Sequence, residues 1–237
     1  HDADVVIVEV GGTVGDIESL PFVESIRQLK WEVGANNFLV VHLTLLPYLA
    51  TSGELKTKPT QHSVKTLLEY GIQPDILVCR ADRKIPRDVR KKISLFCNVT
   101  PNSVIESIDA PTIYDVPLLM LKEKLDTVVL SKMKLSSKGE PNLENWKHFL
   151  GVYKNPTSEV TIGLVGKYVE LHDAYKSIAE SFIHGGVANE CRVNIKWIHS
   201  EGITAENVDQ KLKQLKGIVV APGFGDRGIE GKIHAVK

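Results

Sequence analysis

This chain has little of what marks a disulfide scaffold, a membrane span or a nucleic-acid binder. It has three widely spaced cysteines, Cys79, Cys97 and Cys191, which argue against a disulfide framework and favour the reducing cytoplasm. Its 29 basic and 29 acidic residues cancel, so charge predicts no nucleic-acid or anionic-membrane partner. No apolar run reaches the roughly 18 residues of a membrane span, and no signal peptide is evident. We therefore expect a soluble globular protein.

The two ends of the chain are unusual for a complete protein. It begins at His1 without an initiator Met, directly before an apolar run, and it stops at Lys237 just after a glycine-rich segment. We therefore expect an interior piece of a longer protein.

Apolar runs alternate with helical patterns along the chain. Strands are predicted over residues 5–8, 37–46, 75–80 and 103–106, and helices over 20–33, from the 56–64 segment to about 70, 86–96 and 116–133. After a polar stretch at 135–142 and an amphipathic segment at 144–153, strands at 160–166, 192–198 and 218–220 alternate with helices at 174–188 and 205–215. This alternation predicts an α/β protein with parallel sheets, in two domains.

The segment Val5 to Glu18 is the first candidate site. Its apolar run is typical of a strand buried on both faces, so Glu9 would lie at the ligand-binding edge of a parallel sheet. Gly11, Gly12 and Gly15 then permit a tight turn, and Asp16 and Glu18 add carboxylates. Such a loop suits a divalent cation or the amine and hydroxyl donors of a nucleotide. The alternative for Glu9 is a solvated side chain.

The run Lys56-Thr57-Lys58-Pro59-Thr60-Gln61 is the second candidate. Pro59 suits the first turn of a helix, whose free N–H groups attract anions. Two lysines beside such a turn are suited to a nucleotide triphosphate, although a capped surface helix with solvated lysines would give the same pattern. Together with the acidic loop, this site would suit one pyrimidine nucleotide.

Other candidates are more isolated. Arg80 ends the strand predicted over 75–80 and so faces the same expected edge, and Lys92 lies on the next helix. The segment Ala221 to Lys232 is rich in glycine and follows a strand, so its N–H groups could form an oxyanion hole, or it could be a mobile loop. The histidines form no cluster with metal-ligand spacing.

Five motifs together resemble the glutamine-hydrolysing CTP synthase family. They are Glu9 to Phe22, Lys56 to Val64, Gly71 to Leu77, Val165 to Ser177 and Gly223 to Lys232. The resemblance implies a P-loop or Rossmann-like amidoligase domain over residues 1–133, a linker over 134–157, and the start of a flavodoxin-like class I glutaminase domain over 158–237. It also implies that UTP is phosphorylated by ATP with Mg²⁺ and aminated to CTP by ammonia from glutamine.

The resemblance assigns roles to individual residues. Glu9 matches a Mg²⁺ ligand, Lys58 is the catalytic candidate, and Gly223 matches a glutamine contact. Residues matching the UTP and CTP site are Asp16, Ile17, Glu18, Glu24, Lys56, Thr57, Lys58, Pro59, Thr60, Gln61 and Lys92. Residues matching ATP contacts are Arg80, Ile108, Asp109 and Ala110. CTP is implied as feedback inhibitor, GTP as activator and a homotetramer formed through the amidoligase domain as the assembly.

Some features of the family pattern are missing or altered. The P-loop would precede His1, the glutaminase Cys, His and Glu would follow Lys237, and Ala221-Pro222 replaces the commoner Pro-Gly. This chain by itself is therefore expected to catalyse neither half-reaction. Two alternatives remain: a non-catalytic pyrimidine-nucleotide binding module, and another P-loop relative such as a dethiobiotin-synthetase-like ligase or a partitioning ATPase.

Overall fold

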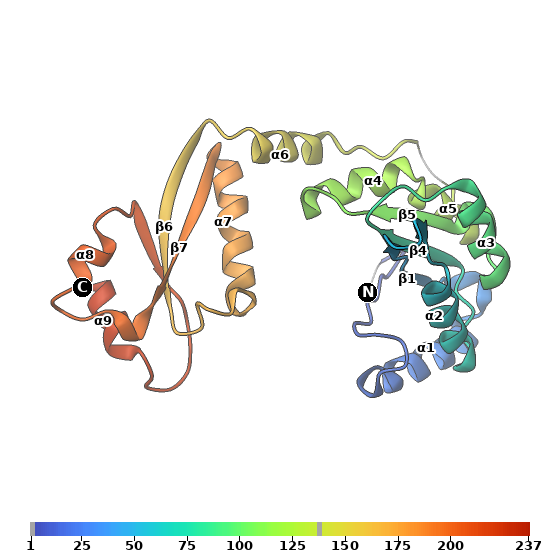
Figure 1. Ribbon diagram of the computed structural model, residues 1–237, viewed down its shortest axis with the longest axis horizontal. Coiled ribbons are helices and arrows are strands. Elements are labelled where there is room, and N and C mark those ends of the chain that lie inside the picture. Colours follow the sequence, from blue (N-terminus) through green and yellow to red (C-terminus); the bar gives the residue numbers. More distant parts are fainter. Residues whose placement is uncertain (1–2, 137–138) are drawn as a thin grey trace. The chain divides into compact units, whose positions relative to one another are not determined.

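The computed structural model describes residues 3–136 and 139–237. The chain divides into two compact units, residues 1–140 and 141–237, each with its own parallel sheet. Figure 1 shows β1, β4 and β5 in the first unit and β6 and β7 in the second. The α/β class with parallel sheets is confirmed, and we describe each unit by itself.

The sheet of the first unit has the order β1-β4-β5, with all neighbours parallel. Its strands are β1 (Val41–Leu45), β4 (Ile76–Ala81) and β5 (Val104–Ile108). The register pairs Leu45 with Arg80 and Ala81 with Ile108. The three carboxyl ends therefore lie along one edge, where ligands of such sheets usually bind.

Helices cover both faces of this sheet. The helices are α1 (Leu20–Val33), α2 (Lys58–Glu69), α3 (Arg87–Cys97), α4 (Val116–Lys122) and α5 (Leu125–Lys132). One core packs side chains of β4 such as Leu77 and Cys79 against Val64 of α2 and Ile93 of α3. On the other face, Ile76, Val78 and Ile105 pack against apolar side chains of α4 and α5.

The predicted strand over residues 5–8 is wrong. These residues have no regular structure, and the side chains of Val6, Ile7 and Val8 are 72%, 92% and 72% exposed. Within the described residues, β1 pairs only with β4, and Val41, Leu43 and Leu45 on its outward face are also exposed. A β-branched run becomes a strand only when a neighbouring strand takes its hydrogen bonds, and here none does so.

Two further local predictions differ from the structure. The expected loop at 47–55 contains a short antiparallel hairpin of β2 (Tyr48–Leu49) and β3 (Glu54–Leu55). The helix expected over 116–133 is broken at Lys124, whose φ of 60° is left-handed. A left-handed residue cannot continue a right-handed helix, so α4 ends and α5 begins there.

The second unit also consists of a parallel sheet with helices on both faces. Its sheet has the order β7-β6-β8, with all strands parallel: β6 (Ser158–Gly166), β7 (Cys191–His199) and β8 (Gly217–Val220). Helix α7 (Lys176–Ala188) covers one face, while α8 (Val208–Leu212) and α9 (Ile229–Val236) cover the other. Helix α6 (Glu144–Lys154) packs on α7 through Phe149 and His184, although it lies within the range expected as a linker.

The helices of the described residues are short. None of those within 3–136 and 139–237 is both long and apolar enough to cross a membrane.

Candidate functional site

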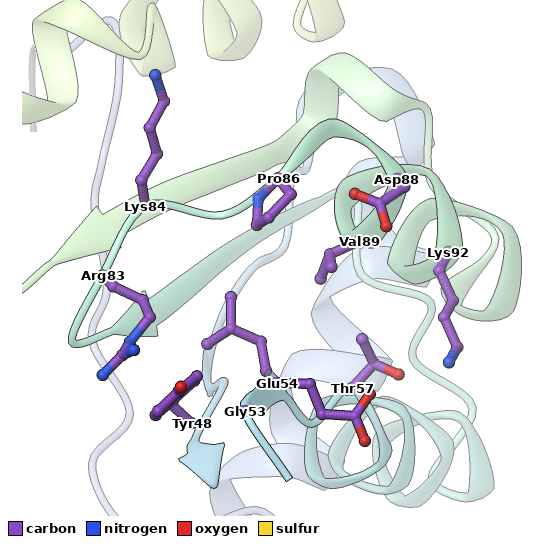
Figure 2. A pocket seen from close by; sticks show the side chains of 11 residues that line it. Tyr48, Gly53, Glu54, Thr57, Arg83, Lys84, Pro86, Asp88, Val89 and Lys92 are labelled. Carbon is purple, nitrogen blue, oxygen red and sulfur yellow. The ribbon is translucent and has the colours of Figure 1, made fainter. Parts of the chain in front are cut away.

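A pocket of about 360 Å³ lies beside the amino end of α2 in the first unit. Figure 2 shows its side chains, which come from the β2–β3 hairpin, the residue before α2, the loop after β4, and α3. Its lining residues are Tyr48, Gly53, Glu54, Leu55, Thr57, Arg83, Lys84, Pro86, Asp88, Val89 and Lys92. Thr57, the residue before α2, and Lys92 of α3, both predicted as pyrimidine-nucleotide contacts, are therefore brought together.

The lysine run forms the amino end of α2, as predicted. Thr57 is the residue before the helix, Pro59 lies in its first turn, and Gln61 Nε2 donates to Thr57 Oγ1 at 3.0 Å. Lys56 forms an ion pair with Glu54, and that hydrogen bond lowers the pKa of the Glu54 carboxyl. The positive charge of Lys56 is thus partly balanced before any anion binds.

Two members of the run, Thr57 and Thr60, are buried, and Thr60 is the more deeply buried of them. Its side chain is fully buried, and its hydroxyl donates to the carbonyl of Leu45 at 3.1 Å. The hydroxyl of Thr44 donates to Thr60 Oγ1 at 3.3 Å. The side chain therefore joins α2 to β1 and is not free to contact a nucleotide.

An aromatic ring near Lys58 was not predicted. The Lys58 ammonium lies 5.9 Å from the ring centroid of Phe96, which is 57% exposed. Phe96 lies four residues after Lys92 on α3, so the two share a helix face. A phenylalanine near the end of an amphipathic helix is usually read as core, and nothing in the sequence alone marked this ring as exposed.

The acidic loop does not lie beside the lysine run within one chain. A Cβ placed on Gly15 would be 3.4 Å from Cγ2 of Thr66, near the carboxyl end of α2. Thr66 is eight residues beyond Lys58 on α2, about 12 Å along the helix. Asp16 Oδ2 accepts the N–H of Thr13 at 3.3 Å, and Ile17 is 83% exposed. Within one chain the two segments therefore lie near opposite ends of α2.

Glu24 already has partners on its own helix. Arg27 Nη2 donates to its carboxylate at 2.6 Å and Gln28 Nε2 at 3.0 Å. The hydrogen bond from Arg27, helped by that from Gln28, lowers the pKa of Glu24 to about 2. Glu24 is therefore a charged surface carboxylate on α1.

The four predicted ATP contacts lie together at the carboxyl edge of the sheet. Arg80 Nε forms an ion pair with Asp109 Oδ1 at 3.2 Å, and the N–H of Asp109 donates to the carbonyl of Ala81 at 3.0 Å. Ile108, the last residue of β5, and Ala110 are half-buried next to this pair. The parallel register of β4 and β5 brings these distant segments into contact.

Glu9 is exposed and lies in the irregular segment before the acidic loop. Over the described ranges, no group of three or more His, Cys, Asp or Glu side chains is arranged to hold a metal ion. A Mg²⁺ ion in a nucleotide site needs only one or two protein carboxylates, because phosphates and water supply the other ligands. Glu9 fits that limited role, whereas the described residues provide no complete cage of their own.

Gly223 lies in the glycine loop, residues 222–228, which follows β8 in the second unit. The loop residues from Pro222 to Arg227 are exposed, and the Phe224 ring at the tip is 99% exposed. A Cβ added at Gly223 would come within 2.8 Å of Lys167 Cε, so a larger residue there would push the end of the Lys167 side chain aside.

Comparison with known proteins covers both units. Residues 1–135 match the family described as CTP synthase N-terminus, and residues 170–237 match glutamine amidotransferase class-I. CTP synthase of Cytophaga hutchinsonii is 67% identical over 234 residues, which is 99% of this chain and 43% of that protein. The CTP synthases of Flavobacterium johnsoniae and Clostridium acetobutylicum are 63% and 58% identical over 236 residues, which is all of this chain and 44% of each relative.

The chain thus spans less than half the length of these curated relatives. The match to the synthase family nevertheless covers more than half of the chain, and it includes the lysine run and the Arg80–Asp109 pair described above. The chain therefore belongs to the CTP synthase family.

Proposed function

We propose that this chain works in the ATP-dependent amination of UTP to CTP with ammonia from glutamine, the last step of de novo pyrimidine nucleotide synthesis. The observation that carries this proposal is the grouping of Lys56, Lys58 and Lys92 around the amino end of α2. The free N–H groups and dipole of a helix start favour phosphate, and the lysines add positive charge. The triphosphate of UTP, or of CTP as feedback inhibitor, is the ligand proposed there.

Lys58 is the residue to which we assign the catalytic role. Its ammonium is exposed at the first turn of α2, and its neighbours Lys56 and Glu54 are already paired. A cation next to a phosphoryl group in transfer stabilises the charge that develops there. Phe96 offers an exposed ring on which the pyrimidine could stack.

ATP is proposed to bind at the carboxyl edge of β4 and β5. Arg80, Ile108, Asp109 and Ala110 form a half-exposed surface there that suits an adenine base. Glu9 would provide one carboxylate for the Mg²⁺ that accompanies the phosphates. That cation, when bound, supplies charge neutralisation at the phosphates.

Ammonia is proposed to come from glutamine hydrolysed in the second unit. Gly223 would contact glutamine through its backbone, within the exposed glycine loop. GTP is proposed as activator of this half-reaction. The remaining catalytic groups of the glutaminase would lie outside residues 1–237.

We further propose a homotetramer formed through the first unit. The acidic loop and the lysine run of one chain lie near opposite ends of α2. A pyrimidine nucleotide held at the lysine run of one chain could then contact the acidic loop of a second copy. Exposed apolar side chains on and next to α1, including Ile17 and Trp31, support such assembly.

The nucleotide site can be tested by calorimetry with UTP and CTP in the presence of Mg²⁺. We expect micromolar binding to the chain, weakened at least about tenfold by Lys58→Ala, because one charge-assisted phosphate contact is lost. Lys65→Ala, an exposed lysine on the same helix, is the matched control and should bind like the unsubstituted chain. Equal affinity in Lys58→Ala, or an equal loss in Lys65→Ala, would refute the site.

A further inference from the structure

The glycine loop is tied to the sheet by two lysines that the proposed function does not use. Lys167 immediately follows β6, its side chain is 3% exposed, and its Nζ donates to the carbonyl of Phe224. Lys232 on α9 donates from Nζ to the carbonyl of Ala221 at 2.8 Å. Burial, and then the charge of Lys167, lowers the pKa of Lys232. The two ammonium groups therefore share one small space beneath the loop.

The backbone around Lys167 is itself held in place. The hydroxyl oxygen of Tyr175 accepts the N–H of Lys167 at 3.1 Å and that of Tyr168 at 3.3 Å. The Tyr175 ring reaches this position only because residue 166 is glycine, since a Cβ there would lie 2.6 Å from the hydroxyl oxygen. The backbone from which the Lys167 side chain extends is thus held in place by the buried Tyr175.

Arg227 makes the reverse connection from the loop. Its Nη2 donates to the carbonyl of Lys167 at 3.1 Å, and its Nε pairs with Glu201 at 3.2 Å. Lys167 therefore contacts the loop in both directions, as a donor through its side chain and as an acceptor through its backbone. Such paired contacts restrain the loop more than either contact alone.

The bond from Lys167 determines where one loop N–H points. A trans peptide is planar, so its C=O and N–H point in opposite directions. Because the Phe224 carbonyl is held toward Lys167, the N–H of Gly225 must face away from Lys167. Gly225 has a left-handed φ of 78°, which this turn requires. In the described part of the chain, the N–H groups of residues 223–225 donate no hydrogen bond, while Pro222 has no N–H to offer.

We propose that Lys167 is a positioning residue that aligns the N–H groups of the glycine loop toward the oxyanion formed when glutamine is hydrolysed. This inference rests on the proposed glutaminase half-reaction. Oxyanion holes work because their donors are already oriented before charge develops. Without Lys167, the Phe224–Gly225 peptide could rotate, and its N–H would no longer be held in one direction.

The test replaces the matching segment of the full-length Cytophaga hutchinsonii CTP synthase by these 237 residues. In this chimera, Lys167→Met should lower kcat for glutamine hydrolysis on the order of tenfold to a hundredfold, since losing one oxyanion donor costs about that much or more. KM for glutamine should change less than about threefold, because the substrate is still bound. Ammonia-dependent CTP formation by Lys167→Met should stay within about twofold of that of the unsubstituted chimera. In the control Lys216→Met, which replaces an exposed lysine, both the glutamine-dependent and the ammonia-dependent activity should stay within the same range.

Two further variants separate positioning from folding. Tyr175→Phe keeps the ring but removes the hydroxyl, so it should give a smaller loss of kcat in the same direction. Lys167→Arg keeps a donor and should recover part of the activity lost in Lys167→Met. Unchanged kcat in Lys167→Met, or an equal loss of glutamine- and ammonia-dependent activities, would overturn the positioning role. An unsubstituted chimera that uses ammonia but not glutamine would instead overturn the proposed glutaminase function.

Discussion

Arg90 on α3 connects the helices and the sheet of the first unit. Its Nη1 donates to Glu123 Oε2 at 2.7 Å and to the carbonyl of Val104 at 3.1 Å, and its Nη2 pairs with Glu106 at 3.4 Å. Glu106 in turn accepts the N–H of Ile85, in the loop that enters α3. The network thus supports the loop after β4, part of which lines the pocket.

We expect acid to weaken this network. Burial, the largest single influence, raises the pKa of Glu123, but the hydrogen bonds from Arg90 and from the N–H of Glu106, together with the charge of Arg90, outweigh it and hold the pKa below its ordinary 4.5. A carboxyl whose pKa is lower in the folded state than in the unfolded state stabilises the fold at pH values above its unfolded pKa. That stabilisation is lost as the pH falls through the folded-state pKa. Urea unfolding followed from pH 7 to pH 2 should show this loss, which Glu123→Gln should reduce.

Arg90→Met should destabilise the first unit by about 3 kcal/mol at neutral pH, because it leaves two largely buried carboxylates without their partner. The control is Arg87→Met, an exposed residue at the start of the same helix. Equal stability of Arg90→Met and this control would show that the network contributes nothing.

Two helical glycines of the second unit should respond in opposite directions to alanine. A Cβ on Gly231 in α9 would overlap the carbonyl oxygen of Ser200, whereas one on Gly151 in α6 meets nothing within 4 Å. We expect Gly231→Ala to cost about 3 kcal/mol by overpacking, and Gly151→Ala to add about 0.5 kcal/mol through helix propensity. Unfolding by denaturant measures both, and similar midpoints for the two variants would contradict these contacts.

The sequence could predict which candidate residues lie close together where the order of the strands alone brings them to one edge of the sheet. The sequence placed Arg80 at the end of a predicted strand, and the parallel register of β4 and β5 brings it to Asp109. The sequence could not predict the burial of Thr60 or the exposure of Phe96, because both depend on which face of a helix meets the sheet. Lys167 was likewise missed, since its role depends on a contact 57 residues away.

At the scale of elements, α1 was predicted from residue 20 to 33 and has those bounds. Its apolar spacing, with Pro21 in the first turn and Gly34 after the end, is a local signal that needs no partner. The strand predicted at 5–8 failed because a strand depends on a neighbour that the local sequence does not specify. The break between α4 and α5 at Lys124 could not be predicted, because no glycine or proline lies there.

Helix α1 presents Phe22, Leu29 and Val33 on one exposed face, at positions i, i+7 and i+11. If this face joins copies of the chain, the double variant Phe22→Ser and Leu29→Ser should shift the sedimenting mass toward the 26.2 kDa of one chain. Leu171→Ser, which changes an exposed apolar residue of the second unit, should leave the mass unchanged. The same mass distribution in the double variant would exclude this face as the contact.

For the whole molecule, the alternation of strands and helices predicted two α/β units, and each has a parallel sheet between helices. The pattern could not show that the acidic loop and the lysine run of one chain lie apart, because that separation follows from packing at the two ends of α2. The nucleotide site is therefore a property of the assembly in our account.

The most direct test of that account is ammonia-dependent conversion of UTP to CTP by the chimera with the Cytophaga hutchinsonii enzyme, in the presence of ATP and Mg²⁺. We predict that the chimera forms CTP and that Lys58→Ala lowers kcat/KM on the order of a hundredfold, while Lys65→Ala retains it. A chimera that folds but forms no CTP, or a Lys58→Ala variant as active as its parent, would contradict the account.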